Sequence, residues 1–442
     1  MAFNSGVRSS LESLLGAAAV SERPVADLWP LGIMRRRAGH EPPLVQVVRP
    51  DSAQLVCRLL EWAHGAGVQV IPMGGASGVC GALAPTAGQV VLDLGALDHF
   101  EIDEPNLACR AGAGLNGLRL EQALQERGLT LGHYPSSLPV ATVGGLLATR
   151  SSGQESSRYG NVEDMVMGLE VALPDGSLLA ARAAPRSAAG PALHQLWLGA
   201  EGRIGVILEA VLRVHRKPET VIGRGFRLAS VESGLDGLRA VVQAGIRPLV
   251  MRLYDPTDSA FQGLEGEGCL GLIAVAGPGP VAEAEAALVE KLVAGEPLGE
   301  APWERWQRHR FDLSAERLKD LLEPAGSYVD TIEVATSWTQ MPALYEDVRS
   351  ALAHAADLVL CHFSHAYGQG CCAYFTFGGS APSEDAAQAA YQQAWAGAMT
   401  ATLRHGGTIS HHHGVGQVRQ PWLAQEMDGW LQAWDRIQAA LA

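Results

Sequence analysis

The sequence predicts an α+β fold in two parts, the first of which carries glycine-rich loops. Up to about residue 217, apolar residues recur at strand or helix spacing, and glycine-rich segments separate several of the elements. From about residue 221 the patterns continue without such loops, which is typical of an antiparallel sheet with helices on one face. A chain of 442 residues is too long for one ordinary core, so two or three domains are expected.

The composition is that of a folded globular protein, with 47% hydrophobic and 18% charged residues. The formal net charge of -14 argues against a nucleic-acid or anionic-membrane surface, although a local phosphate pocket is compatible with it. The seven cysteines form no Cys-x-x-Cys pair, so we expect reduced thiols in a cytoplasmic protein. The N-terminal residues favour an amphipathic helix over a signal peptide, and no window has the apolar length of a membrane span. We expect at most peripheral membrane contact.

The elements of the first part alternate between strands and helices. After an N-terminal helix, we interpret the triple arginine within residues 34–40 as a solvated turn. The further elements expected are a strand at 44–48, a helix that begins near Pro50, strands at 68–73 and 90–94, a hairpin at 99–111, a helix at 116–127, a hairpin at 165–183 and a strand from about 206.

The second part is expected to alternate in the same way. Its strands are expected at 223–229, 249–254, 271–276, 329–335, 358–364 and 371–377, and its helices at 231–245, 281–292, 303–322, 341–355 and 384–403. A closing helix follows. Its residues Trp430, Leu431, Trp434 and Ile437 share one face, which we expect to lie in a core.

The stretch 132–161 organises the first part. It places two adjacent glycines, a run of small hydroxyl residues and Arg150 inside an otherwise apolar segment. Glycine lets the backbone approach a flat ligand, and hydroxyl and N–H groups can then bond phosphate or a ring edge. The glycine-rich turn at 72–85, directly after a strand, suits a pyrophosphate, and the segment 200–207 repeats the same texture. These segments together predict a cofactor site.

Three consecutive histidines, His411, His412 and His413, form the most pointed polar cluster. Three consecutive side chains cannot share one face of a strand, so at most two would reach one metal, and no His-Glu-x-x-His partner is present. We therefore expect no metal site. Imidazole titrates near neutrality, so we interpret the cluster as proton donors or substrate ligands, with a satisfied turn as the alternative.

At this point the residues resemble a known family. The blocks TVGGLLATRSSGQESSRYGNVEDMV, GAEGRIGVILEAVLRV, RLYDP, DTIEVATSW, GCCAYFTF and GGTISHHHGVG resemble, in this order, those of alkyl-dihydroxyacetonephosphate synthases and their bacterial relatives, which are FAD-linked oxidases of the vanillyl-alcohol-oxidase type. The resemblance implies a two-lobed FAD-binding PCMH-type domain at 1–218, preceded by a helical segment at 1–40. It also implies a cap domain at 219–405 with an antiparallel sheet, and C-terminal helices at 406–442 that return to the first domain.

The resemblance also implies site residues. The implied FAD contacts are Pro72, Met73, Gly74, Gly75, Ala76, Ser77, Gly78, Ser136, Ser137, Ala141, Thr142, Gly144, Gly145, Thr149, Arg150, Ser151, Ser152, Glu201, Gly202, Ile204, Gly205, Val206 and Ile207. Tyr374 takes the position of the residue that moves the substrate C1 proton. His133, Arg252 and the residues 411–413 lie where the family surrounds the flavin and substrate. The substrate phosphate would fall to Lys319, with Arg317 close by.

Two details qualify the expected cofactor and assembly. The pyrophosphate loop reads GGASGV where the family usually has GGGTSV, so FAD is expected to sit differently there or to bind more weakly. No histidine occupies the loop position used for covalent flavin attachment, so we expect non-covalent FAD. The family resemblance further implies a homodimer and a small-molecule or lipid-like substrate.

Three functions remain open at this stage. The first is alkyl-for-acyl exchange on a dihydroxyacetone-phosphate-type substrate, or a related flavin reaction. The second is oxidation of a 2-hydroxy acid or alcohol by the same fold, although the HxGDGNxH metal pattern of such enzymes is replaced here by SHAYGQGCCAYF. The third is a catalytically silent flavin-binding module, which the altered pyrophosphate loop motivates and the retained Tyr374, Arg252 and histidines oppose.

Overall fold

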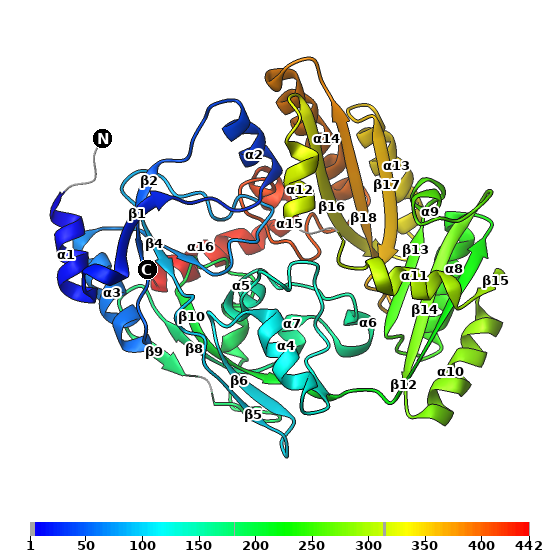
Figure 1. Ribbon diagram of the computed structural model, residues 1–442, viewed down its shortest axis with the longest axis horizontal. Helices are drawn as coiled ribbons and strands as arrows, with labels where there is room; N and C mark the ends of the chain where they lie inside the picture. Colours follow the sequence, from blue (N-terminus) through cyan, green and yellow to red (C-terminus); the bar gives the residue numbers. More distant parts are fainter. Residues whose placement is uncertain (1–4, 181, 313–314, 442) are drawn as a thin grey trace.

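The computed structural model describes residues 5–180, 182–312 and 315–441, which form two α+β domains lying side by side (Figure 1). We call the one built on strands β1 to β11 the N-terminal domain, and the one built on β12 to β18 the cap domain. The C-terminal segment passes between them and ends beside the strands of the N-terminal domain (Figure 1). The predicted α+β class is confirmed.

Two sheets form the lobes of the N-terminal domain. A four-stranded sheet has the order β1 (Val20–Pro24), β2 (Leu44–Val48), β4 (Val90–Asp93), β3 (Val70–Met73), with β4 parallel to both β2 and β3. The helix α3 (Ala53–Ala66) makes the crossover between β2 and β3. A five-stranded antiparallel sheet has the order β5 (Phe100–Asp103), β6 (Ala108–Gly112), β10 (Val206–Arg213), β8 (Val166–Ala172), β9 (Leu178–Ala180).

Short elements connect these lobes. Helix α4 (Gly117–Gln125) begins after Asn116, whose side chain accepts a hydrogen bond from the N–H of Arg119, and α5 (Val143–Ala148) begins after Thr142 in the same manner. The remaining elements are β7 (Leu129–Thr130), α6 (Ser156–Tyr159), α7 (Val162–Met165), η2 (Leu193–Leu196) and β11 (His215–Arg216).

One seven-stranded antiparallel sheet forms the cap domain. Its order is β15 (Glu296–Gly299), β12 (Thr220–Leu228), β14 (Cys269–Gly277), β13 (Val250–Tyr254), β17 (Leu358–Ser364), β18 (Gly370–Ser380), β16 (Ser327–Ser337). Its helices are α8 (Val231–Gln243), α9 (Pro256–Phe261), α10 (Gly279–Leu292), α11 (Ala301–His309), α12 (Ala315–Leu322), α13 (Met341–Ala353) and α14 (Glu384–Arg404).

The two faces of the cap sheet are covered differently. Helices α8, α10, α13 and α14 pack on one face, where they share a core with residues such as Ile273 and Phe375. On the other face, Trp303 and Trp306 of α11 pack on Leu272 and its neighbours in a separate, smaller core. The expectation that all helices lie on one face is therefore wrong for α11, because the alternate residues of β14 are also apolar.

Within the described residues, the N-terminal segment combines helices with strand β1, and the triple arginine does not form a solvated turn. It closes α2 (Pro30–Arg37), after α1 (Ser5–Leu15) and η1 (Ala17–Ala19), and basic side chains suit the negative end of a helix dipole. Arg37 pairs with Glu384 of α14 at 2.7 Å and donates to the carbonyl oxygens of Leu322, Pro324 and Ser327. This side chain fastens the N-terminal segment to the cap domain.

The chain closes with α15 (Gln420–Met427) and α16 (Gly429–Leu441). Trp434 and Leu441 pack against the core of the N-terminal domain, as the expected C-terminal return requires. Trp430 is 78% exposed, so the expectation that it lies in a core is wrong. The seven cysteines are free thiols, and the described residues contain no helix with the length and apolarity to traverse a bilayer.

Candidate active site at the domain junction

A row of polar side chains crosses the open face of the cap sheet. His362 of β17 lies opposite Tyr374 of β18, and Tyr374 lies opposite Glu333 of β16. The chain neighbours of each are apolar and point into the helix-covered core, so the pleat directs the polar residues to the other face. Arg252 of β13 also lies on this face, since Met251 and Leu253 belong to the helix-covered core. The alternation in the sequence carried the signal for Glu333 and His362, which our prediction missed.

Tyr374 is held within this row. Its ring stacks on His362 with centroids 4.8 Å apart, and its hydroxyl donates to Oγ1 of Thr331 at 3.1 Å. Burial raises the pKa of Tyr374 above its ordinary value, so the residue is a neutral phenol that can donate a hydrogen bond.

The predicted histidine cluster lies against the same face. The ring of His412 stacks on that of Tyr374 with centroids 6.1 Å apart. The rings of His413 and Tyr374 are perpendicular, with centroids 5.7 Å apart. His411 shares a 2.8 Å hydrogen bond between its Nδ1 and Nδ1 of His412, and its Nε2 lies 2.7 Å from the hydroxyl of Tyr367. The structure therefore brings the three histidines and Tyr374 together.

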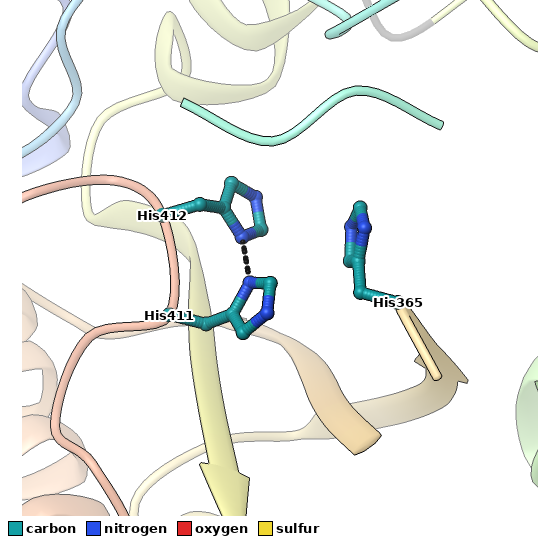
Figure 2. Close-up of side chains that lie close together, drawn as sticks. All are labelled: His365, His411 and His412. Atoms are coloured by element: carbon teal, nitrogen blue, oxygen red, sulfur yellow. Dashed lines mark hydrogen bonds between the residues drawn. The ribbon is translucent and has the colours of Figure 1, made fainter. Parts of the chain in front are cut away.

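A further imidazole, which the sequence analysis missed, completes the cluster. His365 follows β17 in a left-handed conformation with φ 49°, and its ring lies 5.0 Å from His411 and 5.1 Å from His412 (Figure 2). One ring nitrogen of each of these three residues lies within 4.8 Å of the others, a spacing that could hold a metal ion. The sequence analysis allowed at most two of the three consecutive histidines to reach one metal, and the third ring nitrogen of this set comes from another loop.

Four imidazoles of the site, those of His133, His365, His411 and His412, are neutral. Burial lowers the pKa of His133 to about 3 and that of His411 to about 4. Burial also holds the pKa of His365 and that of His412 well below the ordinary value, with neighbouring imidazoles acting in the same direction. Neutral imidazole offers one donor and one acceptor, so the cluster can pass protons without carrying charge.

Buried nitrogen atoms of His133 and Arg252 lack hydrogen-bond partners among the described residues. Both ring nitrogens of His133, which is fully buried, make no hydrogen bond, and neither does Nε of Arg252. Arg252 stacks on Trp306 at 5.2 Å, and its charge contributes to lowering the pKa of His365. Buried polar atoms are normally bonded, so these atoms point to a ligand that would satisfy them.

Two carboxylates from different domains hold the loop 410–416 that carries the histidines. Glu333 of the cap accepts from the N–H groups of His412 and His413 at 3.3 and 2.9 Å. Glu201 of the N-terminal domain accepts from the N–H groups of Val415 and Gly416 at 2.7 and 3.1 Å. The implied FAD contact Glu201 therefore has its carboxylate engaged by this loop.

Arg310 joins the domains beside the cluster. It follows α11, and Nη1 lies 3.5 Å from Oε1 of Glu155 in the N-terminal domain. Its guanidinium also stacks on Tyr134 at 4.9 Å and on Trp306 at 5.4 Å. Burial raises the pKa of Glu155 to about 7, although Arg310 acts in the opposite direction. Neither Arg310 nor Glu155 was among the predicted site residues.

The predicted cofactor segments border a second space. A hollow of ≈ 1100 Å³ is lined by Pro72, Glu201, Gly202, Gly205 and Val206, among others, and by Gly416 of the histidine loop. It lies between the lobes, since its walls come from β3 and from the segment before β10. Part of the predicted cofactor set therefore shares one cavity.

The glycine pair of the predicted pyrophosphate loop also serves packing. A Cβ on Gly74 would collide with Oγ1 of Thr142, and one on Gly75 would collide with the carbonyl oxygen of Val140. The next residue, Ala76, has φ 51°, a left-handed conformation that suits glycine. The loop thus keeps a glycine-type backbone although the sequence places alanine there.

The other implied FAD contacts pack in the core, bond other protein groups or lie at the surface. Ile204 and Ile207 lie in the N-terminal core, Arg150 pairs with Glu163 at 3.0 Å, and Ser152 donates to Asn161 at 2.6 Å. Thr149 bonds the carbonyl oxygen of Gly145, Ser136 is exposed, and Met73, Ala141, Gly144 and Ser151 are buried, while Ser77, Gly78 and Ser137 remain at least partly accessible.

The implied phosphate residues lie elsewhere. Arg317 and Lys319 are exposed on α12, and Lys319 lines a separate hollow of ≈ 590 Å³ together with Arg36 and Arg37. Basic groups that do lie beside the histidine cluster include Arg252, Arg310 and Arg419. The sequence alone could not show where Lys319 lies, because the placement of α12 depends on how this helix packs against α2.

Comparisons with protein families match the two domains separately. The model of the FAD binding domain matches residues 45–182, and the model of the C-terminal domain of FAD linked oxidases matches residues 217–441. The second match alone spans more than half of the chain.

Relatives of known sequence cover most of the chain. An alkyldihydroxyacetonephosphate synthase of Dictyostelium discoideum is 30% identical over 89% of this chain and 71% of its own length. The FAD-linked oxidoreductase YgcU of Escherichia coli strain K12 is 32% identical over 85% of this chain and 82% of its own. Glycolate oxidase subunit GlcD of Bacillus subtilis is 27% identical, over 86% of this chain and 83% of its own.

Solved structures of similar proteins have the same fold. An alkyldihydroxyacetonephosphate synthase superposes with a TM-score of 0.81 at 25% identity, over 98% of this chain and 82% of that one. A p-cresol methylhydroxylase superposes with a TM-score of 0.80 at 15% identity, over 100% and 95%, which shows the shared fold. The chain therefore belongs to the FAD-linked oxidase family with a PCMH-type FAD-binding domain.

Proposed function

We propose that this protein is an FAD-dependent enzyme that exchanges an alkyl for an acyl group on a dihydroxyacetone-phosphate-type substrate. The observation that carries the proposal is the set of neutral imidazoles, one phenol and the Arg252 guanidinium with its unpartnered Nε, gathered at the domain junction. The identity to alkyldihydroxyacetonephosphate synthases supports the same reading. Such a set suits proton transfer beside an anionic substrate, which the exchange requires.

The residues present fit FAD. The hollow of ≈ 1100 Å³ between the lobes is large enough for the nucleotide, and His133 offers buried ring nitrogens without a partner close to the histidine cluster. Pro72 and Gly202 would border the cofactor, and no covalent attachment is required. When bound, FAD supplies an electron-accepting ring against which the substrate carbon is held.

The chain's own groups have distinct roles in the exchange. The bond between C1 and the acyl oxygen breaks, the fatty acid leaves, and a long-chain alcohol forms the ether bond with loss of its proton. The ring nitrogen of neutral His412, or that of His413 beside it, accepts a proton, and Tyr374 donates a hydrogen bond. Arg252 pairs with an anionic group of the substrate, since its Nε is unsatisfied and its stacking on Trp306 fixes its direction.

A second function is favoured by a specific observation. The three ring nitrogens of His365, His411 and His412 could bind a divalent metal, and a metal could bind the hydroxyl and carboxylate of a 2-hydroxy acid. The identity to glycolate oxidase subunit GlcD is consistent with this alternative. Metal content of the purified protein is therefore informative.

The test supplies purified protein and FAD with acyl-dihydroxyacetone phosphate and a long-chain alcohol, and measures the ether product and the free fatty acid by mass spectrometry. Equal amounts of the two products support the exchange. Absence of ether product, together with a stoichiometric divalent metal and anaerobic reduction of the flavin by a D-2-hydroxy acid, would replace it with the oxidase function. The Tyr374→Phe variant should lose turnover while it retains FAD.

A further inference from the structure

We propose that Glu333 is a positioning residue that fixes the histidine loop 410–416 and orients His413 for proton transfer. The inference rests on the proposed function for the reaction in which His413 acts, while the arrangement itself is a property of the fold. It assigns a role to a cap residue that does not line the cofactor hollow.

Glu333 accepts hydrogen bonds from the first part of the loop, residues 410–413. Oε1 accepts from the N–H groups of His412 and His413 at 3.3 and 2.9 Å and from Oγ of Ser410 at 3.2 Å. Oε2 lies 3.0 Å from Nδ1 of His413, at ion-pair distance although off the line of a hydrogen bond. A carboxylate with so many partners sets the direction of the side chains that its donors carry.

Arg419 holds the other side of this carboxylate. It is fully buried, contacts Oε2 of Glu333, and donates to the carbonyl oxygens of Ile409 at 2.7 Å and Gly414 at 3.0 Å. These two carbonyl groups lie before and after the three histidines in the chain. The guanidinium therefore links both sides of the histidines to the carboxylate of Glu333. The pair therefore satisfies buried charge and loop backbone at once.

The orientation has a chemical consequence. A carboxylate beside Nδ1 of a histidine favours the tautomer that carries its proton on Nδ1 and leaves Nε2 as the acceptor. The rings of His413 and Tyr374 are perpendicular with centroids 5.7 Å apart, which places this imidazole beside the predicted substrate position. Without Glu333 the imidazole would lose both its tautomer preference and its direction.

The test is a double-mutant cycle between Glu333 and His413. Glu333→Gln and His413→Gln are each expected to lower kcat at least tenfold with little change in KM, and the double variant is expected to be no slower than the slower single variant. Asp330→Asn is the matched control, because Asp330 is a buried acid of the same strand that bonds Tyr391 and Trp395 instead. It should lose thermal stability but keep turnover.

Further measurements keep the proposal open to refutation. If Glu333→Gln does not fold, Ser410→Ala removes one donor to Glu333 and should lower kcat severalfold without loss of fold. Independently of turnover, the visible spectrum and circular dichroism of bound FAD should shift in Glu333→Gln and in His413→Gln, and not in Asp330→Asn. Additive effects in the cycle, or an unshifted flavin spectrum in Glu333→Gln, would overturn the positioning role. If the wild-type protein lacks the exchange reaction while Glu333→Gln and His413→Gln still show these spectral shifts, only the proposed function is refuted.

Discussion

Nη1 of Arg310 lies 3.5 Å from Oε1 of Glu155, and this contact crosses the junction between the cap and the N-terminal domain. Arg310 also covers Tyr134, the chain neighbour of His133. The active site therefore exists only in the docked arrangement of the two domains.

Glu155→Gln should stabilise the protein progressively as pH rises. Burial raises the pKa of Glu155 to about 7, so between its ordinary value of 4.5 and pH 7 the folded state holds a proton that the unfolded state has released. Stability is lost as pH rises through this window, and glutamine removes that loss, by up to about 3 kcal/mol. Urea unfolding at pH 5 and pH 8 measures it, with the exposed Glu101→Gln as control. A gain that is the same at both pH values would contradict the burial argument.

His133→Leu should stabilise the protein while it impairs the site. The folded imidazole is neutral, fully buried and without hydrogen-bond partners, so leucine should gain about 1–3 kcal/mol. Because the pKa of His133 is about 3 when folded, only the unfolded state takes up its proton below pH 6.5. The advantage of leucine should therefore grow by about 1 kcal/mol per unit as pH falls from 6.5. Thermal melts at pH 7.5 and 5.5 decide this, and weaker FAD binding by the variant should accompany the gain.

Ala76→Gly should raise stability, because the left-handed backbone at φ 51° costs alanine more than glycine. The gain is expected to reach about 1 kcal/mol, reduced by the greater freedom of glycine in the unfolded chain. The matched control is Ala287→Gly at an exposed position inside α10, which should destabilise by about 1 kcal/mol. Differential scanning calorimetry of both variants suffices. A loss of stability in Ala76→Gly would mean that the loop relaxes in solution.

Arg37→Met should destabilise the protein by about 2–3 kcal/mol, since it leaves Glu384 and several carbonyl oxygens without their donor. Arg35→Met is the control, because Arg35 is exposed on the same helix and should cost much less. Urea unfolding measures both. Equal effects of the two substitutions would contradict the role of Arg37 as the fastening between α2 and the cap.

The sequence predicts the local elements well where apolar periodicity is strong. The strands Leu44–Val48 and Leu358–Ser364 begin and end where expected, and the hairpin around Pro105 forms. The site is predicted only where a motif is local, as for His411. His365 stands in a loop with left-handed φ, and its contact with the histidine loop arises from docking of distant segments. Lys319 was assigned by its position in the family's sequence pattern, yet it lines a separate hollow together with Arg36 and Arg37.

The visible spectrum of the purified protein tests the central claim most directly, before and after anaerobic addition of acyl-dihydroxyacetone phosphate and, separately, of D-2-hydroxy acids. We predict a flavin absorption band that the acyl phosphate perturbs without bleaching and that the hydroxy acids leave unchanged. Absence of a flavin band, even after FAD is added, would contradict the assignment of an FAD-dependent enzyme. Bleaching by a hydroxy acid would contradict the exchange reaction and support the oxidase.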